Sequence, residues 1–206
     1  MIGILAAMAD ELVAADYSLE NVHYSITGIG KVNAAFQATS FILNKQPTAI
    51  INVGCAGALP NTGIHKGDVV VSTGCRYTDV DVTAIGYDLG QVPGCPIIFE
   101  SDKKLLEAVL KDSVDIPIHT GTIGTGDRFM QKKFIEEVFQ YNVKAIDMES
   151  AAIAQVCHWL NIPFISIRYI SDVVGKDEPK TFTNWLQKAS ETTIKLALKT
   201  VNINTK

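Results

Sequence analysis

Three acidic residues that are far apart in the chain, Glu11, Glu149 and Asp172, each lie just beyond a short apolar run. The runs are residues 2–8, 143–148 and 163–170. If these runs form parallel strands of one sheet, the three carboxyl groups gather at one edge of it, where α/β proteins bind their ligands. Carboxyl groups that converge in one cleft are suited to general acid and base catalysis. We therefore expect bond-breaking acid/base chemistry at this edge.

The acids also have simpler interpretations. Asp172 follows a run too apolar for a surface strand, so we expect burial to raise its pKa above the reference value of about 3.9, as suits a general acid. A capping aspartate would look the same locally, and Arg168 on the same face of the strand could form a simple ion pair. Glu149 begins a predicted helix, whose dipole would favour its ionised form. It could accept two hydroxyl groups, but a capping role alone fits the sequence equally well.

Three segments with glycines follow predicted strands: residues 28–31 (GIGK), 52–57 (NVGCAG) and 124–130 (GTGDRFM). The first could offer backbone amides at a helix start to a polar ligand, although an ordinary tight turn is favoured. The second has small residues that would let the backbone approach a flat ligand, and a structural turn fits as well. Phe129 and Met130 could enclose a planar base, or they could be core residues at a helix start. The first segment does not match a P-loop, and the second does not match a dinucleotide-binding pattern.

Apolar runs alternate with stretches of helical period, which predicts an α/β fold. We expect one domain over residues 1–206, with three layers (α/β/α) and a central mixed, mostly parallel twisted sheet. The expected strands are residues 2–7, 22–27, 48–53, 67–77, 117–124, 143–148 and 163–170. The expected helices are residues 31–44, 101–111, 130–140, 149–160 and 182–202. Ser101 and Asp102 can cap one helix, and Thr181 or Thr183 can cap the last.

The composition excludes several classes of partner. The net charge of −4 offers no basic face for nucleic acid. The N-terminus lacks the positively charged lead of a secretory signal, and every apolar run is shorter than the roughly 20 residues of a membrane helix. We therefore expect a cytoplasmic protein that does not bind membranes. The four cysteines and four histidines lack metal-ligand spacing, so we expect reduced thiols, no metal and no cofactor.

The segment of residues 79–99 carries several glycines and prolines among apolar side chains. A loop of this length in a compact domain is usually functional or disordered. Its apolar side chains would be poorly accommodated in water. We expect it to pack on a second subunit.

Seven segments in order resemble the bacterial 5′-methylthioadenosine/S-adenosylhomocysteine nucleosidases, members of the purine nucleoside phosphorylase superfamily. They are residues 4–11 (ILAAMADE), 28–32 (GIGKV), 52–57 (NVGCAG), 81–87 (DVTAIGY), 91–94 (QVPG), 145–149 (AIDME) and 170–173 (ISDV). The resemblance covers nearly the whole chain. It implies a nucleoside phosphorylase-like fold and hydrolysis of the N-glycosidic bond of 5′-thioadenosines, with release of adenine and a 5-thioribose. This reaction serves methionine salvage and the recycling of S-adenosylmethionine by-products, and 5′-deoxyadenosine is a further candidate substrate.

The resemblance also implies roles for particular residues. Glu11 would activate the attacking water, Glu149 would hold ribose hydroxyls beside Met148, and Asp172 would protonate N7 of adenine. Phe129 would stack on the base while the backbone of Met130 reads its edge. Other positions that line the family's pocket are matched by Met8, Ile29, Cys55, Ala56, Gly57, Arg168, Ser171 and Phe182. Val82, Ile85 and Pro93 match the loop that covers the alkylthio group in the neighbouring subunit, which implies a homodimer.

Two alternatives stay open at this stage. A phosphorylase would bind phosphate through arginines or helix N-termini, but Asn52 stands where the related bacterial phosphorylases carry an arginine, and Glu11 would repel phosphate. This favours hydrolysis. A nucleoside-binding protein without turnover is the second alternative, because the stretch between Glu11 and Gly28 is much shorter than in typical members. Cys55 also stands where the family usually has serine, so a hydroxyl hydrogen bond there becomes a weaker thiol one.

Overall fold

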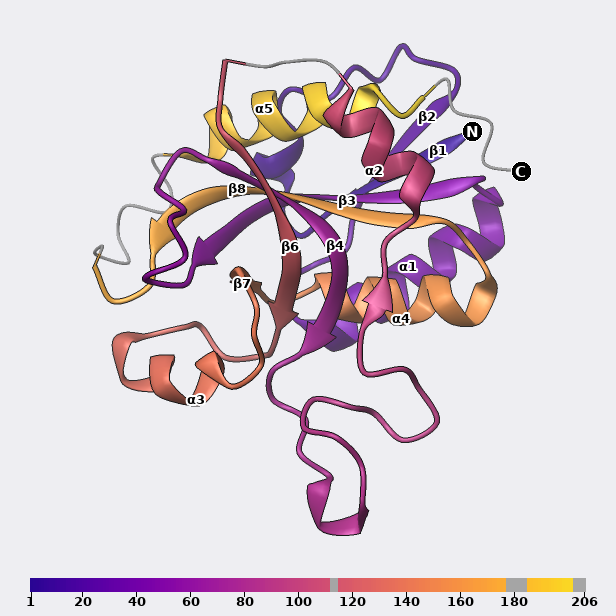
Figure 1. The fold of residues 1–206 in the computed structure, drawn as a ribbon. Helices are drawn as coiled ribbons and strands as arrows, with labels where there is room; N and C mark the ends of the chain where they lie inside the picture. Colours follow the sequence, from indigo (N-terminus) through magenta and orange to yellow (C-terminus); the bar gives the residue numbers. More distant parts are fainter. Residues whose placement is uncertain (112–114, 177–184, 202–206) are drawn as a thin grey trace.

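The computed structural model of the chain describes residues 1–111, 115–176 and 185–201. Within these residues, one mixed sheet of eight strands has the order β2-β1-β3-β7-β6-β4-β5, and β8 pairs with both β3 and β4 (Figure 1). The strands are β1 (Ile2–Ala6), β2 (Val22–Ile26), β3 (Ala49–Ala58), β4 (Val69–Tyr77), β5 (Phe99–Glu100), β6 (Ile118–Thr125), β7 (Ala145–Asp147) and β8 (Phe164–Val173). The predicted mixed α/β fold is confirmed, whereas the single domain over residues 1–206 stays a prediction.

Helices lie on both sides of this sheet (Figure 1). On one side are α1 (Lys31–Lys45) and α4 (Ser150–Leu160), and on the other are α2 (Lys103–Leu110) and α5 (Leu186–Leu198). The remaining helical elements are the short α3 (Ile135–Phe139) and the 3-10 turns η1 (Ala9–Leu12), η2 (Thr83–Ile85) and η3 (Lys132–Phe134). None of the helices in the described ranges is long and apolar enough to cross a membrane.

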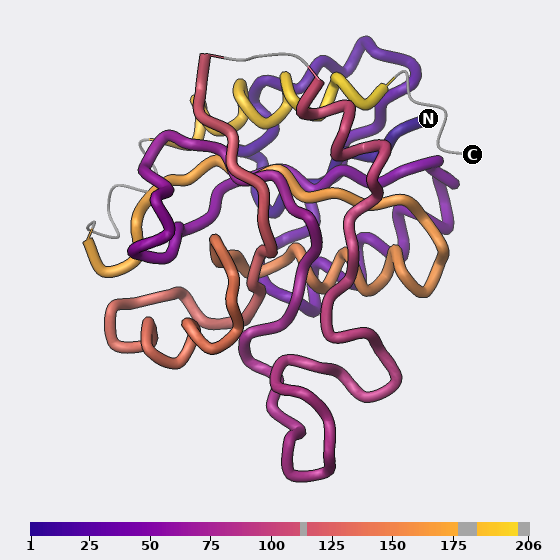
Figure 2. The backbone as a smooth tube through the Cα atoms, in the orientation of Figure 1, coloured from indigo at the N-terminus to yellow at the C-terminus, as the bar shows by residue number. Residues whose placement is uncertain are grey.

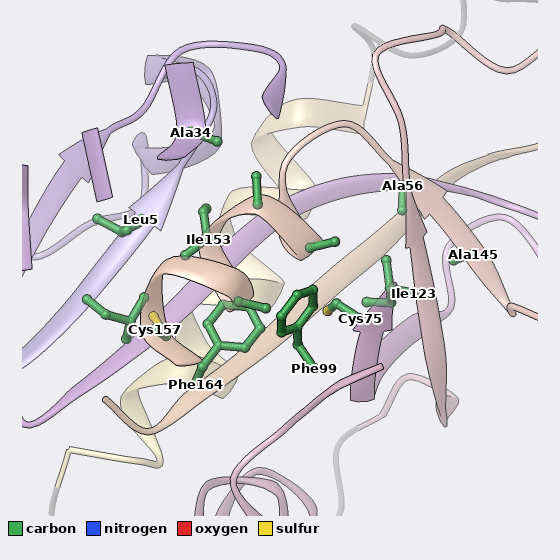
Figure 3. Packing of buried hydrophobic residues seen from close by; sticks show 14 of the residues in the cluster. Leu5, Ala34, Ala56, Cys75, Phe99, Ile123, Ala145, Ile153, Cys157 and Phe164 are labelled. Carbon is green, nitrogen blue, oxygen red and sulfur yellow. The ribbon is translucent and has the colours of Figure 1, made fainter. Parts of the chain in front are cut away.

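Each face of the sheet buries its own apolar cluster. In β1, Leu5 packs in the cluster that includes α1 and α4, whereas Ile4 and Ala6 pack on the opposite face with residues of α2 and α5. Figure 3 shows part of the first cluster, in which Phe99 and Phe164 are two of the aromatic residues. All five residues of β1 are buried, as expected for a strand that is covered on both faces. The core therefore holds the sheet rigidly from both sides.

The direction of one strand differs from the sequence-based hypothesis. Strand β3 is parallel to both β1 and β8, but β7 is antiparallel to β3, with Gly57 opposite Ile146. The assumption of three parallel acid-bearing strands is therefore wrong for the run before Glu149. Because β7 runs back along β3, the residues that follow it still approach the part of β3 near Ala56. The three acids thus meet by a mixed arrangement of strands.

Several boundaries also differ from the predicted ones. Strand β3 continues to Ala58 and β8 to Val173, beyond the predicted ends at residues 53 and 170, because the two strands pair with each other up to these residues. The glycines in this part of β3 resemble a loop in the sequence. Strand β5 was not predicted, since a strand of two residues leaves no periodic pattern. The predicted helix at residues 130–140 is broken into η3 and α3.

One of the two predicted helix caps lies within the described residues. Asp102 caps α2, and its side chain accepts a hydrogen bond of 3.0 Å from the backbone N–H of Leu105, so this prediction is confirmed. Thr181 and Thr183, the predicted caps of the last helix, lie outside the described residues.

The segment between β4 and β5 extends away from the sheet (Figures 1 and 2). It is held at its base, where the Arg76 guanidinium donates a hydrogen bond of 2.6 Å to the carbonyl of Leu89. A backbone hydrogen bond of 2.9 Å from Gly90 to Val80 closes the loop near the same point. Farther out, the side chain of Ile85 is 71% exposed. The loop is thus anchored to the sheet while it presents apolar side chains to the outside.

Candidate active site

A cavity of about 150 Å³ lies among the ends of β1, β3, β7 and β8, and Glu11, Glu149 and Asp172 all line it. The structure therefore brings together the three acids that the sequence separates by up to 161 residues. Nine other residues predicted for the site also line this cavity: Met8, Ile29, Cys55, Ala56, Gly57, Phe129, Met130, Met148 and Ser171.

Glu11 is held by backbone amides. It lies in η1, directly after β1, and its Oε2 accepts hydrogen bonds from the N–H groups of Ala7 (3.0 Å) and Met8 (3.1 Å). Its Oε1 accepts one from the N–H of Cys55 in β3 (2.9 Å). Burial raises the pKa of Glu11, and Arg168 and these N–H groups partly offset this effect. A fixed carboxylate with a raised pKa is suited to take a proton near neutral pH.

Gly54 makes room for this carboxylate. A Cβ atom at this position would clash with Oε1 of Glu11 and with a guanidinium nitrogen of Arg168. Its φ of +143° also lies in a region that L side chains rarely adopt. Glycine is therefore required here by close approach, and the turn interpretation of residues 52–57 does not apply to Gly54, which lies inside β3.

Glu149 lies between two elements. Its Oε1 accepts a hydrogen bond of 3.0 Å from the N–H of Gly30, at the start of α1, and its Oε2 lies 3.8 Å from the guanidinium of Arg168. Burial raises the pKa of Glu149 to about 7, with Arg168 acting in the opposite direction and Asp147 in the same direction. The segment 28–31 could have offered a backbone amide to a polar ligand. In the structure, the amide of Gly30 binds the carboxylate of Glu149 instead.

Asp172 reaches the cavity through an irregularity in β8. Ile170 pairs with Ala56 and Asp172 with Gly57, so Ser171 is an extra residue between them. Such a bulge interrupts the alternation of side chains along a strand, and Ser171 and Asp172 both line the cavity. The Ser171 hydroxyl donates a hydrogen bond of 2.7 Å to Oδ1 of Asp172. The raised pKa expected for Asp172 stays a prediction.

Arg168 lies beneath the cavity and does not line it. It is fully buried, and its closest carboxylate is Asp147, at 2.8 Å. The guanidinium faces the carboxylates of Asp147 and Glu149. Asp147 also accepts hydrogen bonds from the backbone N–H groups of Glu149 and Ser150, both at 3.2 Å. The capping role considered for Glu149 therefore belongs to Asp147.

Five residues of the site carry little or no sequence signal. Asp147, Ala7, Arg128, Ile146 and Val174 all line the cavity. Asp147 gave one usable signal, since it stands two residues before Glu149 at the end of an apolar run. Arg128 gave none, because its ion pair of 2.6 Å with Glu137 joins residues of different elements.

The aromatic side of the cavity is its open side. Phe129 and Ile29 are both 51% exposed, although both line the cavity. Their segments are tied together by Asp127, whose Oδ1 accepts a hydrogen bond of 2.7 Å from the backbone N–H of Lys31. The ammonium group of Lys31 in turn forms an ion pair of 2.7 Å with Asp79, at the base of the protruding loop.

The remaining predicted site residues lie elsewhere. Val82, Ile85 and Pro93 are in the protruding loop and do not line the cavity of their own chain. Phe182 lies outside the described residues. The thiol of Cys55 lines the cavity, but burial raises its pKa, which agrees with a small buried side chain and disfavours a nucleophile.

The comparisons with known proteins agree with this geometry. The family model described as "Phosphorylase superfamily" matches residues 4–202. The chain is 41% identical to the 5′-methylthioadenosine/S-adenosylhomocysteine nucleosidase of Bacillus subtilis (strain 168) over 197 residues, which cover 93% of this chain and 85% of that relative.

Solved structures show the same likeness. The nucleosidase of the same name from Neisseria meningitidis, in complex with methylthio-immucillin-A, has a TM-score of 0.91 and 34% identity, with 97% of each chain covered. The nucleosidase from Colwellia psychrerythraea 34H, in complex with adenine, has a TM-score of 0.90 and 34% identity, with 97% of this chain and 93% of that chain covered. The resemblance stated from the seven segments is therefore confirmed. The chain belongs to the phosphorylase superfamily and, within it, to the family of 5′-methylthioadenosine/S-adenosylhomocysteine nucleosidases.

Proposed function

We propose that the protein hydrolyses the N-glycosidic bond of 5′-methylthioadenosine and S-adenosylhomocysteine and releases adenine and the 5-thioribose. The observation that carries this proposal is the convergence of Glu11, Glu149 and Asp172 on one cavity. Three carboxyl groups match three tasks of the reaction: activating water, binding the ribose and protonating the leaving base. The protein would then act in methionine salvage and in the recycling of S-adenosylmethionine by-products.

In the proposed reaction, Asp172 acts on the leaving base and Glu11 acts on the water that attacks the sugar. The bond between N9 and C1′ breaks with its electron pair passing to adenine, and Asp172 donates a proton to N7. The water oxygen bonds to C1′ of the oxocarbenium-like sugar while Glu11 takes a proton from that water. A positioned acid and a positioned base each contribute roughly 10²–10⁴-fold. Glu149 accepts hydrogen bonds from ribose hydroxyls, and its anionic form favours the positive charge that develops on the sugar.

The base would lie on the open side of the cavity. Phe129 would stack on adenine, and the backbone of Met130 would read its edge. Met148 would pack beside the ribose that Glu149 holds. All four residues line the cavity, and a half-exposed aromatic ring has an apolar face available for a planar ligand.

Water rather than phosphate is the nucleophile in this proposal. The nucleophile must lie beside Glu11, whose carboxylate repels an anion and can accept a proton from water. The buried Arg168 is already paired with Asp147, and Arg128 at the cavity wall is paired with Glu137. A phosphorylase would use such cations for phosphate.

Adenine release from 5′-methylthioadenosine in buffer free of phosphate tests this proposal, with S-adenosylhomocysteine and 5′-deoxyadenosine as parallel substrates. Hydrolysis should give adenine at a rate that added phosphate does not increase. A strict requirement for phosphate, with ribose 1-phosphate chemistry in the product, would instead identify a phosphorylase. Tight binding of the nucleoside without any adenine would identify a binding protein.

We further propose a homodimer in which residues 79–99 of one subunit complete the site of the other. The loop projects beyond its own subunit (Figure 2) and carries the exposed Ile85. Helix α1 adds an exposed apolar stripe with a spacing that places its members on one side of the helix: Val32 (78% exposed), Phe36 (74%) and Leu43 (62%). Apolar surface of this kind marks a protein interface.

Subunit mixing tests the shared site. The variant Asp172→Asn lacks the acid but keeps the loop, and Ile85→Asp keeps the acids but places a charge in the loop. Each homodimer should be weakly active. A mixed dimer contains one site with both intact parts, so unfolding and refolding the two variants together should restore activity. Activity no greater than the sum of the separate variants would argue against a loop that acts across the interface.

A further inference from the structure

Asp147 is a buried carboxylate that the catalytic scheme above does not use. Its Oδ1 accepts hydrogen bonds from the hydroxyl of Thr125 (2.6 Å) and from the N–H groups of Glu149 and Ser150. Its Oδ2 accepts one from the hydroxyl of Ser150 and lies 2.8 Å from Arg168. The carboxylate therefore joins β6, β7, the start of α4 and β8 at one point in the wall of the cavity.

The guanidinium of Arg168 is shared unequally between two acids. The same terminal nitrogen lies 2.8 Å from Asp147 and 3.8 Å from Glu149. It also donates hydrogen bonds to the side-chain oxygen of Asn52 and, at 3.0 Å, to the hydroxyl of Ser150. Coulomb attraction falls with distance, so the pairing favours Asp147. Glu149, which lines the cavity, receives the weaker share of the positive charge.

We propose that Asp147 is a positioning residue, which holds the Arg168 guanidinium beneath the cavity and so limits how far that charge compensates Glu149. This inference rests on the nucleosidase function proposed above. If the guanidinium were free to move to Glu149, it would occupy the carboxylate oxygen that the ribose hydroxyls need. Asp147 thus keeps the binding carboxylate available to the substrate.

The charges around Glu149 make it sensitive to this arrangement. Arg168 and Asp172 approach from β8, Asp147 from β7 and Glu11 from η1, and the amide of Gly30 donates from the start of α1. Burial raises the pKa of Glu149 to about 7, Arg168 lowers it, and Asp147 and Glu11 raise it. Near neutral pH, a small change in charge therefore alters the ionised fraction of Glu149.

The variant Asp147→Asn tests the proposal, because it keeps the shape of the side chain and removes its charge. The acidic limb of the pH profile of kcat/KM should move to lower pH by about one unit, since a lost negative neighbour and a freer Arg168 both favour the Glu149 anion. Turnover should also fall, as the guanidinium competes with the ribose hydroxyls. If Asp147 only caps α4, thermal stability and activity would fall while the acidic limb stayed in place, and the proposal would be overturned.

Two further variants separate charge from structure. Thr125→Val removes a hydrogen bond to Asp147 without changing charge, so it should lower thermal stability and leave the limb in place. Asp147→Glu keeps the charge and should also leave the limb near its wild-type position. If Asp147→Asn does not fold, Asp147→Glu becomes the deciding variant. An acidic limb displaced by about one pH unit in Asp147→Glu would contradict a role for the charge of residue 147.

A readout that does not need turnover separates this inference from the proposed function. The titration of the Glu149 side-chain carboxyl carbon, followed by NMR, should have a lower midpoint in Asp147→Asn than in the wild type. A wild-type protein that releases no adenine would refute the nucleosidase function, while the NMR midpoints would still test the positioning. An active wild type with unchanged midpoints would refute the positioning alone.

Discussion

At the scale of single residues, the three acids differ in what holds them. Glu11 is bound by three backbone N–H groups, Glu149 by one such group and a distant guanidinium. Asp172 accepts a hydrogen bond from its neighbour Ser171. Glu11 is therefore fixed by the backbone of the fold, whereas Asp172 also contacts a neighbouring side chain. Substitutions of Glu11 and Asp172 should therefore differ in their effects on stability.

Asp172→Asn should reduce turnover by roughly 10²–10⁴-fold, because the amide keeps hydrogen-bonding capacity but cannot act as the general acid. The affinity for adenine or for a nucleoside analogue should fall much less. Steady-state kinetics and calorimetric binding measure the two effects separately. Near-normal turnover would remove Asp172 from the role of acid, and Ser171→Ala is the control for loss of its hydrogen bond.

Glu11→Gln should lose both activity and stability. An amide has one acceptor oxygen, so its NH₂ group must face at least one of the backbone N–H groups that Glu11 now satisfies. An unsatisfied buried donor costs roughly 1–3 kcal/mol. Chemical denaturation should show this loss, and turnover should fall by about as much as in Asp172→Asn. An unimpaired rate would argue against a base at position 11.

At the scale of elements, β3 places the site. Its central residues contact Glu11 through Cys55 and lie against β8, which supplies Arg168 and Asp172. Gly54 stands between these groups, where a Cβ atom would clash with Glu11 and Arg168. The strand therefore acts as the common wall against which two of the three acids are positioned.

Gly54→Ala should displace Glu11 and Arg168 and reduce turnover by at least roughly 10-fold, in line with the sensitivity of catalysis to small misplacements. Gly63→Ala is the matched control, because Gly63 also has a positive φ of 74° but nothing lies within 4 Å of its added Cβ. Both variants should lose stability from backbone strain, while the loss of turnover should be specific to Gly54→Ala. Equal turnover in the two variants would refute the close-approach argument.

The sequence predicted most elements because most carry a local pattern. The apolar runs at residues 2–7 and 22–27 end within one residue of β1 and β2. The three acids stand next to such runs, whereas other cavity residues such as Met8 and Ser171 follow only from the resemblance to the family. The direction of β7 and the bulge at Ser171 have no local signal, since both depend on which strands pair. Asp147 has a local signal in its place at the end of an apolar run, but that signal does not reveal its partner. Its importance comes from Arg168, 21 positions away.

At the scale of the whole molecule, the buried acids couple folding to pH. Burial raises the pKa values of Glu11 and Glu149 in the folded state, that of Glu149 to about 7. Between the usual value of 4.5 and about 7, folded Glu149 therefore holds a proton that the unfolded chain has released. The unfolded state then binds fewer protons, and the free energy of unfolding falls as pH rises through this window. Near neutral pH, ionisation of these buried carboxyl groups lowers the free energy of unfolding.

This prediction can be measured by denaturation at several pH values. The contribution of one fully linked group is about 1.4 kcal/mol per pH unit. Glu149→Gln should flatten the dependence between mildly acidic and neutral pH, whereas Glu136→Gln, at the surface, should leave it unchanged. A wild-type stability that rises over this range would contradict the raised pKa of the buried acids.

The extra residue in β8 limits which changes the strand can accept. Because Ser171 interrupts the ladder, two consecutive side chains face one cavity. Deleting one residue there would restore a regular alternation and turn either position 171 or position 172 to the opposite face of the sheet. The number of residues in β8 therefore determines whether the acid faces the cavity. A mutational library built on this strand should tolerate substitutions at position 171 far better than any change in the number of residues.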